Sequence, residues 1–399
     1  MSFENSLQVQ RSWNLQGAFS NGSIVVDKLV PNRFTRIRTP FINTWRSEQV
    51  SSTLNWGSQS FSWYLPESLR VVSSIFIRIP LPALNSGEYK DIPGLYAVER
   101  VRFLSAGNES YFCELGQYLR DYIESLTNEE AKRFVTTYLG HTGAAASGAA
   151  RVLMIPLPLP NSAYISRHGA DSHGHGIWPC YTGSVRLECQ ISMAPADSVC
   201  KTGASTPASI SGNVSMEIHQ CDMSADDTLR YSDVRGQYSV ITRRMTELSD
   251  GFSSAVANVR QKLTQNQPLG CVTELFVIAV PAGTDAGKRE IQNMVQATHF
   301  SITSDSVTQK SLNTPEKVAM ELWNNGFVGN DYCQCPSRLC FAAHAAQAES
   351  MWTGGYNMQQ SSQITIDLEF AEAVDYRLFA IQLQRVTVNS AGLVQASLD

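Results

Sequence analysis

The densest set of potential metal ligands is a histidine-rich stretch in the first half of the chain. It contains His168, Asp171, His173 and His175, and Cys180 follows closely. Imidazole, thiolate and carboxylate groups are zinc ligands, and two histidines one residue apart on a strand face the same side. The glycines beside these histidines favour a polar surface loop over a tetrahedral site. We therefore expect a polar loop, and ion binding by this loop stays the alternative.

Two other motifs could carry chemistry, but each departs from the spacing that its chemistry needs. Cys333 and Cys335, near Cys340, lack the second Cys-x-x-Cys pair of a structural zinc site, so we expect buried thiols. The stretch from Gly283 to Lys288 has one residue fewer between its glycines than a phosphate-binding loop requires, so we expect a plain turn. Neither G-x-S-x-G nor H-E-x-x-H occurs. We predict no catalytic, cofactor-binding or metal-binding residues and no enzyme.

The low charge of the chain is its most unusual compositional feature. Only 17% of the 399 residues are charged, against about 25% in an ordinary soluble domain. The hydrophobic fraction of 43% indicates a large core, and the length favours two domains. The surface must then be rich in uncharged polar residues or be partly covered by partners. A net charge of −5 without a Lys/Arg cluster argues against direct sequence-specific nucleic-acid binding.

The N-terminal residues and the cysteines indicate a protein that is made and kept in a reducing compartment. Residues 1–5 lack the basic and apolar regions of a signal peptide. The longest apolar runs, such as residues 276–281, are far shorter than the roughly 20 residues that span a bilayer. Nine cysteines, an odd number, fit free thiols better than a disulfide framework. We expect no structural disulfides, and membrane contact is left open.

Short runs of alternating apolar and polar residues dominate the chain, which is the period-two pattern of half-buried strands. Between Val185 and Ile191, for example, apolar residues alternate with Arg186, Glu188 and Gln190. The predicted strands cover residues 58–65, 71–81, 98–103, 185–191, 237–243, 271–280, 338–342, 363–370 and 376–388. We predict an all-β fold.

Three short helices are predicted between groups of strands. Because helices and strands do not alternate one for one, a parallel βαβ sheet is excluded. The first helix covers residues 117–125. The second follows a capping box at residues 127–130 and ends at Gly140, and the third runs from residues 314–315 to Gly326. The second carries one apolar face, and the third has apolar residues at helical spacing: Ala131, Phe134, Val135 and Tyr138, and Val318, Met320, Leu322 and Trp323.

The C-terminal segment resembles the end of the major capsid proteins of icosahedral double-stranded DNA viruses, the lineage of the large nucleocytoplasmic DNA viruses and the adenovirus hexon. The glycines and asparagine of a loop, a strand-opening tyrosine and a closing Gly-Leu match: Gly354, Gly355, Asn357, Tyr376 and Gly392–Leu393. The passage from residue 228 to 241 looks like the connection between the family's two jelly rolls. Residues 118–131 look like the helical excursion in its first roll. The chain departs from the family at residues 352–354, where Trp-Thr-Gly replaces Pro-Ser-Gly.

The resemblance implies two eight-stranded antiparallel jelly-roll sandwiches in tandem, with short helices in inter-strand loops. It implies an N-terminal arm at residues 1–20, a first roll at 21–225, a linker at 226–236 and a second roll at 237–399. The function implied is structural. Homotrimers would form pseudo-hexagonal capsomers that tile the icosahedral shell of a virion, in contact with each other and with penton and minor capsid proteins. Neither catalytic residues nor cofactors are implied.

A second hypothesis is a glycan-acting or carbohydrate-binding double jelly-roll protein. It requires acidic and tryptophan side chains in one cleft, together with a secretory signal and disulfides. Core packing is the expectation for several tryptophans, because they lie on predicted strand or helix faces. The tryptophans are at positions 13, 45, 56, 63, 178, 323 and 352.

Overall fold

The structure is a computed structural model in which the chain forms two compact units. Unit 1 comprises Met1–Thr242, Glu349–Met351 and Arg385–Ser397, and unit 2 comprises Arg243–Ala348, Trp352–Gln384 and Leu398–Asp399. The residues that the structure describes are 41–56, 60–65, 71–105, 108–116, 119, 123, 129–141, 148–157, 178–179, 187–201, 203–204, 209–223, 238–249, 251–265, 270–283, 294–324, 336–341, 355–358, 361, 363–388 and 394–398. The predicted arm (1–20) and linker (226–236) lie outside them.

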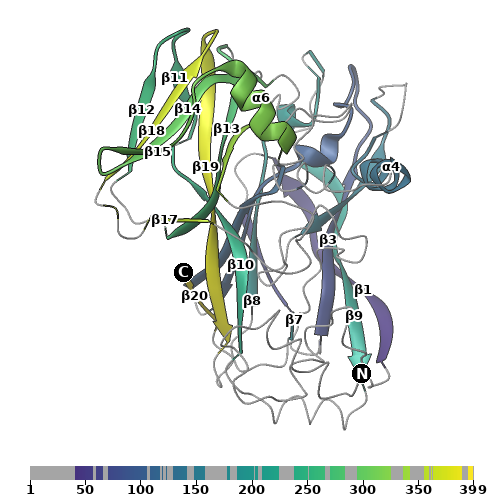
Figure 1. Cartoon of the computed structure of the whole chain (residues 1–399). Helices are drawn as coiled ribbons and strands as arrows, with labels where there is room; N and C mark the ends of the chain where they lie inside the picture. The colour runs from purple at the N-terminus through teal and green to yellow at the C-terminus, as the bar shows by residue number, and fades with distance from the viewer. Residues whose placement is uncertain are drawn as a thin grey trace. The chain divides into compact units, whose positions relative to one another are not determined.

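Unit 1 is built from two antiparallel sheets (Figure 1). One has the strand order β1-β9-β3-β6 with β7 paired to β3, and the other has the order β2-β8-β4-β5. The elements are β1 (Phe41–Asn55), β2 (Ser60–Tyr64), β3 (Val71–Leu81), η1 (Pro93–Leu95), β4 (Val98–Ser105), β5 (Asn108–Glu114), α4 (Glu129–Tyr138), β6 (Arg151–Leu157), β7 (Trp178–Pro179), β8 (Leu187–Met193), η2 (Ala196–Ser198) and β9 (Ser209–Met223). Alternate residues such as Ile75, Ile77 and Ile79 are fully buried, as the period-two pattern predicts.

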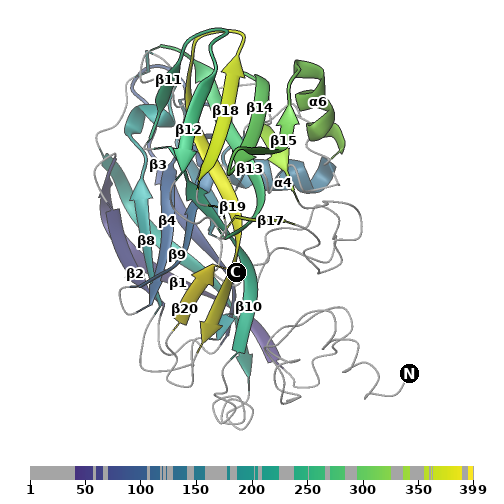
Figure 2. The same cartoon turned by 60° about the vertical axis from the view of Figure 1, so that its left-hand side comes forward.

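Unit 2 repeats this plan. Its sheets have the orders β10-β19-β13-β16 and β12-β18-β14-β15, with β11 and β20 paired to β19 and β17 paired to β13. The first residues of β10, the last residues of β19 and all of β20 except Leu398 fall within the limits of unit 1. Figure 2 shows α6 next to β15. The elements are β10 (Tyr238–Glu247), β11 (Ser253–Ala255), β12 (Gln261–Gln265), β13 (Cys271–Pro281), β14 (Ala297–Ser304), β15 (Val307–Leu312), α6 (Pro315–Asn324), β16 (Ser337–Cys340), β17 (Tyr356–Asn357), β18 (Ile364–Phe370), β19 (Val374–Val388) and β20 (Val394–Leu398).

The two units have the same topology. When the short strands β7, β11, β17 and β20 are left out, the main strands of either unit follow the orders 1-8-3-6 and 2-7-4-5. This is the jelly-roll arrangement. Each unit carries a helix between its fifth and sixth main strands, α4 in unit 1 and α6 in unit 2. The predicted all-β fold of two jelly rolls with helices in inter-strand loops is confirmed.

Individual elements agree with the sequence to different degrees. The strand predicted at 71–81 coincides with β3, and those at 271–280 and 363–370 match β13 and β18 within one residue at each end. In the first predicted helix, Leu119 and Ile123 are helical and fully buried, and most of the rest lies outside the described residues. The long strands β1 and β9 were not predicted. The alternation of Val214, Met216 and Ile218 in β9 is the signal that could have found it.

The sheet that contains β13 is buried on both of its faces. One face, with Leu275 and Val277, lies in the sandwich core of unit 2. The other face carries Phe276 and Phe379, which are fully buried and stack with a ring-centroid distance of 5.0 Å. A strand buried on both faces has a continuous run of apolar residues instead of an alternating pattern, and residues 275–281 of β13 form such a run.

A buried ion pair completes this second face. Arg338 lies directly opposite Phe276 in the ladder, with its guanidinium carbon 5.0 Å from the centre of that ring. Its Nη1 donates to Glu274 Oε2 at 2.8 Å, and neither side chain has any solvent-exposed surface. A charge removed from water in this way must be paired, so each partner depends on the other.

We expect Arg338→Met to destabilise the protein strongly, because Glu274 would be left as a buried charge without its cation. The expected loss is about 3–5 kcal/mol in the free energy of unfolding, measured by denaturant titration of the full chain. The matched control is Arg260→Met, which removes a more exposed pair with Glu369 and should cost less than about 1 kcal/mol. Equal losses in the two variants would contradict the role given to the buried pair.

Candidate assembly surface

The residues with metal-binding or nucleophilic chemistry do not form a site in the described part of the chain. The histidine-rich stretch, Cys333 and Cys335 lie outside the described residues, as does the stretch after Gly283. Among the residues that are described, no group of three His, Cys, Asp or Glu could hold a metal ion. Cys340 is a free thiol at the end of β16, and burial raises its pKa. A buried thiol of this kind is a poor nucleophile.

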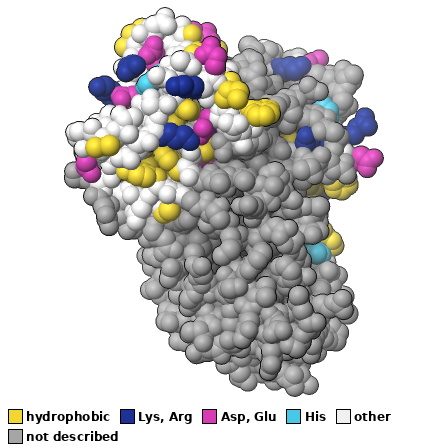
Figure 3. Space-filling view, viewed as in Figure 1, with side chains coloured by type: hydrophobic (Ala, Val, Ile, Leu, Met, Phe, Trp, Pro, Cys, Tyr) yellow, Lys and Arg dark blue, Asp and Glu magenta, His cyan; other side chains and the backbone are white. Residues whose placement is uncertain are grey.

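The features that stand out instead are the helices α4 and α6, which occupy equivalent positions in the two jelly rolls. Both expose large apolar side chains. In α4, Phe134 is 62% and Tyr138 46% exposed. In α6, Met320 is 53% and Trp323 65% exposed, and Figure 3 shows apolar side chains at the surface over α6. Exposed clusters of this size mark contacts with partners more often than isolated apolar residues do.

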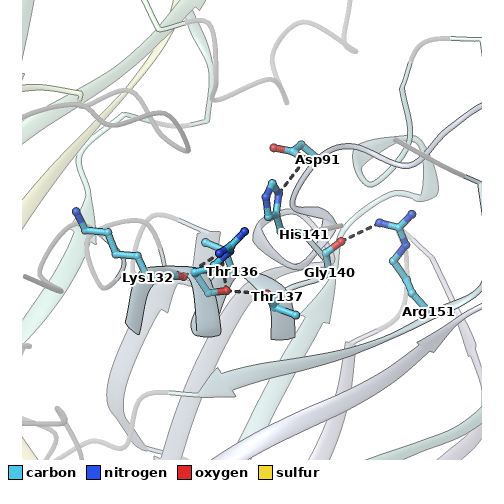
Figure 4. Close-up of polar contacts among 8 residues, drawn as sticks. Asp91, Lys132, Thr136, Thr137, Gly140, His141 and Arg151 are labelled. Carbon is cyan, nitrogen blue, oxygen red and sulfur yellow. Dashed lines mark hydrogen bonds and ion pairs between the residues drawn. The ribbon is translucent and has the colours of Figure 1, made fainter. Parts of the chain in front are cut away.

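Helix α4 turns its aromatic face outward because a threonine and not an aromatic residue anchors it. Thr136 is fully buried, and its hydroxyl donates to the carbonyl oxygens of Lys132 at 2.9 Å and Arg133 at 3.1 Å (Figure 4). These bonds satisfy the hydroxyl within the helix, so it can be buried without a further partner. Phe134 and Tyr138 are left on the other side, where their rings pack with centroids 4.6 Å apart.

The C-terminus of α4 is fixed by close backbone contacts. Gly140 adopts φ +97°, and a Cβ atom there would lie 2.7 Å from Leu153 Cδ2. The Gly94 amide donates to the Leu139 carbonyl at 2.8 Å, and the Arg151 guanidinium donates to the Gly140 carbonyl at 2.8 Å (Figure 4). The helix end therefore lies against both η1 and β6, and its last carbonyls are paired.

Polar and aromatic side chains beside the C-terminus of α4 make further contacts. His141 Nδ1 lies 2.9 Å from Asp91 Oδ1. The Arg151 guanidinium lies 5.1 Å from the centre of the Tyr89 ring. Burial raises the pKa of Tyr89 to about 12, so this phenol stays protonated and donates to the Pro82 carbonyl. The Arg151 side chain therefore links the end of α4 to the sheet, since it contacts the Gly140 carbonyl and the uncharged Tyr89 ring.

Helix α6 follows the same plan with different residues. Thr314 caps it, accepting from the Lys317 amide at 3.4 Å, as its sequence predicted. Val318 and Leu322 are buried, and Glu321 accepts from the Cys340 amide at 3.0 Å, which ties the helix to β16. Met320 and Trp323 remain exposed.

Core packing therefore holds for only some of the predicted apolar residues. Trp63, on a predicted strand, is buried, but Trp323, on a predicted helix, is 65% exposed, so the core-packing expectation is wrong for Trp323. Of the tryptophans outside the predicted elements, Trp56 is buried and Trp45 is 61% exposed. An apolar helical face is usually taken as a buried face. In α4 the aromatic residues of this face are exposed, because Thr136 and Leu139 provide the buried contacts instead.

In the described part of the chain, no helix has the length and hydropathy needed to cross a bilayer.

Comparison with known proteins shows which proteins share this fold. The sequence matches no protein-family model and no curated protein. The structure is similar to that of the Faustovirus major capsid protein, with 9% identity and a TM-score of 0.63 over 98% of this chain and 97% of that chain. The chain has the double jelly-roll fold of viral major capsid proteins.

Two further capsid structures share the fold along most of the chain. A chain of the PBCV-1 virus capsid is 12% identical, with a TM-score of 0.61 over 90% of this chain and 97% of that chain. The mavirus major capsid protein is 9% identical, with a TM-score of 0.53 over 89% of this chain and 90% of that chain. At these identities the similarity lies in the double jelly roll and its element order.

We expect Gly140→Ala to weaken the contacts that hold the C-terminus of α4 against η1 and β6. A side chain there is strained by the positive φ, and the added methyl group meets Leu153 and Pro93 at 2.7 and 2.8 Å. The expected cost is about 2–4 kcal/mol of stability by denaturant unfolding, with increased amide exchange in α4. The control is Gly203→Ala, because Gly203 has φ +83° but nothing within 4 Å, so that variant should show the backbone cost alone. If both variants lose the same stability, the close packing at Gly140 is unimportant.

Proposed function

We propose that the protein is a structural major capsid protein of an icosahedral double-stranded DNA virus, located in the virion and made in the host cell without secretion. Its chains would form homotrimers, and the trimers would form pseudo-hexagonal capsomers that tile the shell. The observation that carries the proposal is the double jelly roll, which aligns with capsid proteins over about nine-tenths or more of both chains. The proposed function resides in contacts between chains and not in a catalytic centre.

The physical properties of the chain suit this role. Two jelly rolls with the same topology would give a trimer six similar sandwiches, which approximates the hexagonal symmetry of a flat lattice. Stable subunit interfaces are depleted of charge in their core, and only 17% of the residues here are charged. Equivalent helices with exposed apolar residues, α4 and α6, would repeat around the capsomer.

The remaining partners follow from the same proposal. Penton and minor capsid proteins would complete the shell, and the acidic net charge supports a chain that does not neutralise the genome itself. We propose no enzyme activity and no cofactor. The domain limits expected from the sequence, 21–225 and 237–399 with an arm and a linker, stay part of the proposal. Nothing in the described residues supports the carbohydrate hypothesis.

Light scattering after size-exclusion chromatography tests the trimer. At a chain concentration of tens of micromolar we expect one species with three times the chain mass, and electron microscopy of that species should show a pseudo-hexagonal outline. A monomer throughout this concentration range would overturn the proposal.

The exposed helices give a separate prediction about contacts between capsomers. The double variant Phe134→Ser, Trp323→Ser changes two side chains with 62% and 65% exposure, so folding stability should change by less than about 1 kcal/mol. We expect trimers of normal mass that form fewer ordered arrays or shells in electron micrographs. Val256→Ser is the control, because this exposed valine lies on neither helix. Arrays as abundant as those of the unmodified protein would show that the helices do not make these contacts.

A further inference from the structure

The first sheet of unit 1 has an outward face that includes neither α4 nor α6, the helices proposed above to make contacts between capsomers. We name it the Trp45 face. Its residues come from β1, β9 and β3 and stand opposite one another in three rows: Trp45–His219–Ser74, Ser47–Glu217–Phe76 and Gln49–Ser215–Arg78. The core-facing neighbours Val214, Met216, Ile218, Ile75 and Ile77 are fully buried, so these nine residues face away from the core. Within the face, the β1 residues Trp45, Ser47 and Gln49 are exposed, whereas Ser74 and Ser215 are buried.

An exposed tryptophan lies at one end of this face. Trp45 is 61% exposed although its ring packs against two neighbours, with centroid distances of 4.9 Å to His219 and 5.7 Å to Phe76. These contacts hold the indole in place on the sheet. A fixed, exposed indole loses little conformational entropy on binding and offers a large apolar area, and tryptophan is among the residues that contribute most to protein interfaces.

Hydrogen-bonded polar groups adjoin the aromatic residues. Glu217 Oε1 accepts from the Ser47 hydroxyl at 2.9 Å and from the Ser215 hydroxyl at 2.6 Å, and the Gln49 amide donates to Asn213 at 3.3 Å. Within the nine residues, the only permanent charges are those of Glu217 and Arg78. An apolar anchor next to satisfied polar groups, with few charges, is the composition of a protein–protein interface and unlike that of a nucleic-acid surface.

The equivalent sheet of unit 2 allows a comparison, because its outward face is buried. It has the same strand order, and its outward face carries Phe276 and Phe379 in the corresponding middle strands. There both rings are fully buried within a single chain. In unit 1 the same face of the same topology exposes Trp45, so the described part of the chain leaves this face incompletely covered.

We infer that the Trp45 face binds a second copy of this chain and is the subunit contact of the homotrimer. The inference rests on the proposed capsid function and adds the residues of the contact. A second copy is the occupant to which the observations point, because the same chain already covers the equivalent face of unit 2 and because the face is nearly uncharged. A closed ring of three copies has three equivalent contacts, and in each of them this face of one chain would meet a different surface of the next chain.

Sedimentation velocity on full-length protein tests the contact with two variants. Trp45→Ala removes the anchor, and Gln49→Arg places a bulky charge on an exposed position of the same face. Both positions are exposed, so folding should survive, which circular dichroism and thermal unfolding check. We expect either variant to raise the concentration at which trimers dissociate by at least tenfold. Val256→Ser, an exposed apolar position in unit 2, is the control and should leave it unchanged.

The outcomes separate this inference from the proposed function. If the unmodified protein, Trp45→Ala and Gln49→Arg all form trimers of equal stability, the inference is overturned and the capsid proposal stands. Sugar binding at Trp45, instead of subunit contact, would give that same result. If the unmodified protein is a monomer at tens of micromolar, the capsid proposal fails and the inference fails with it. Weaker trimers in both folded variants, with an unchanged control, support the Trp45 face as the contact.

Discussion

The need to cover both faces of one sheet governs unit 2. Residues 275–281 of strand β13 are apolar on both sides, so its sheet is stable only when both of its faces are kept from water. Phe276 and Phe379 stack on that face, and the ion pair between Arg338 and Glu274 is sealed beside them. Once both charges are buried, each has to keep its partner, because a single buried charge without its counterion is costly.

The same topology has a different outcome in unit 1. Its first sheet carries an exposed tryptophan on the outer strand β1, whereas the phenylalanines on the two middle strands of the equivalent sheet of unit 2 are buried. Its helix α4 also carries an exposed aromatic pair. Each exposed group is held firmly, Trp45 by Phe76 and His219 and α4 by Thr136 and the close contacts at Gly140. Rigid apolar groups on a weakly charged surface lower the entropic cost of association. The low charge of the sequence then agrees with a chain whose surface is completed by other chains.

Much of the fold could be predicted from local patterns, and the candidate surface could not. The run at 71–81 and the Thr314–Pro315 helix start depend on neighbours in sequence, so they were found. Strand β1 was missed because its polar residues hide the alternation, and its place is decided by pairing with β9, some 170 residues away. Phe134 and Tyr138 lie on an apolar helical face, which is normally a buried one. Only the burial of Thr136 shows that this helix is turned the other way.

By itself the sequence determined the all-β class, the helices between strands, the weak charge and the resemblance to capsid proteins. These properties depend on composition, on periodicity and on residues close together in the chain. The tertiary structure alone decided which apolar residues are covered, because burial depends on segments brought together from distant parts of the chain. Trp45 and Trp63 lie on consecutive strands that belong to different sheets, yet Trp63 is buried and Trp45 is exposed. That difference, set by which sheet face each occupies, separates the core of this protein from its candidate contact surface.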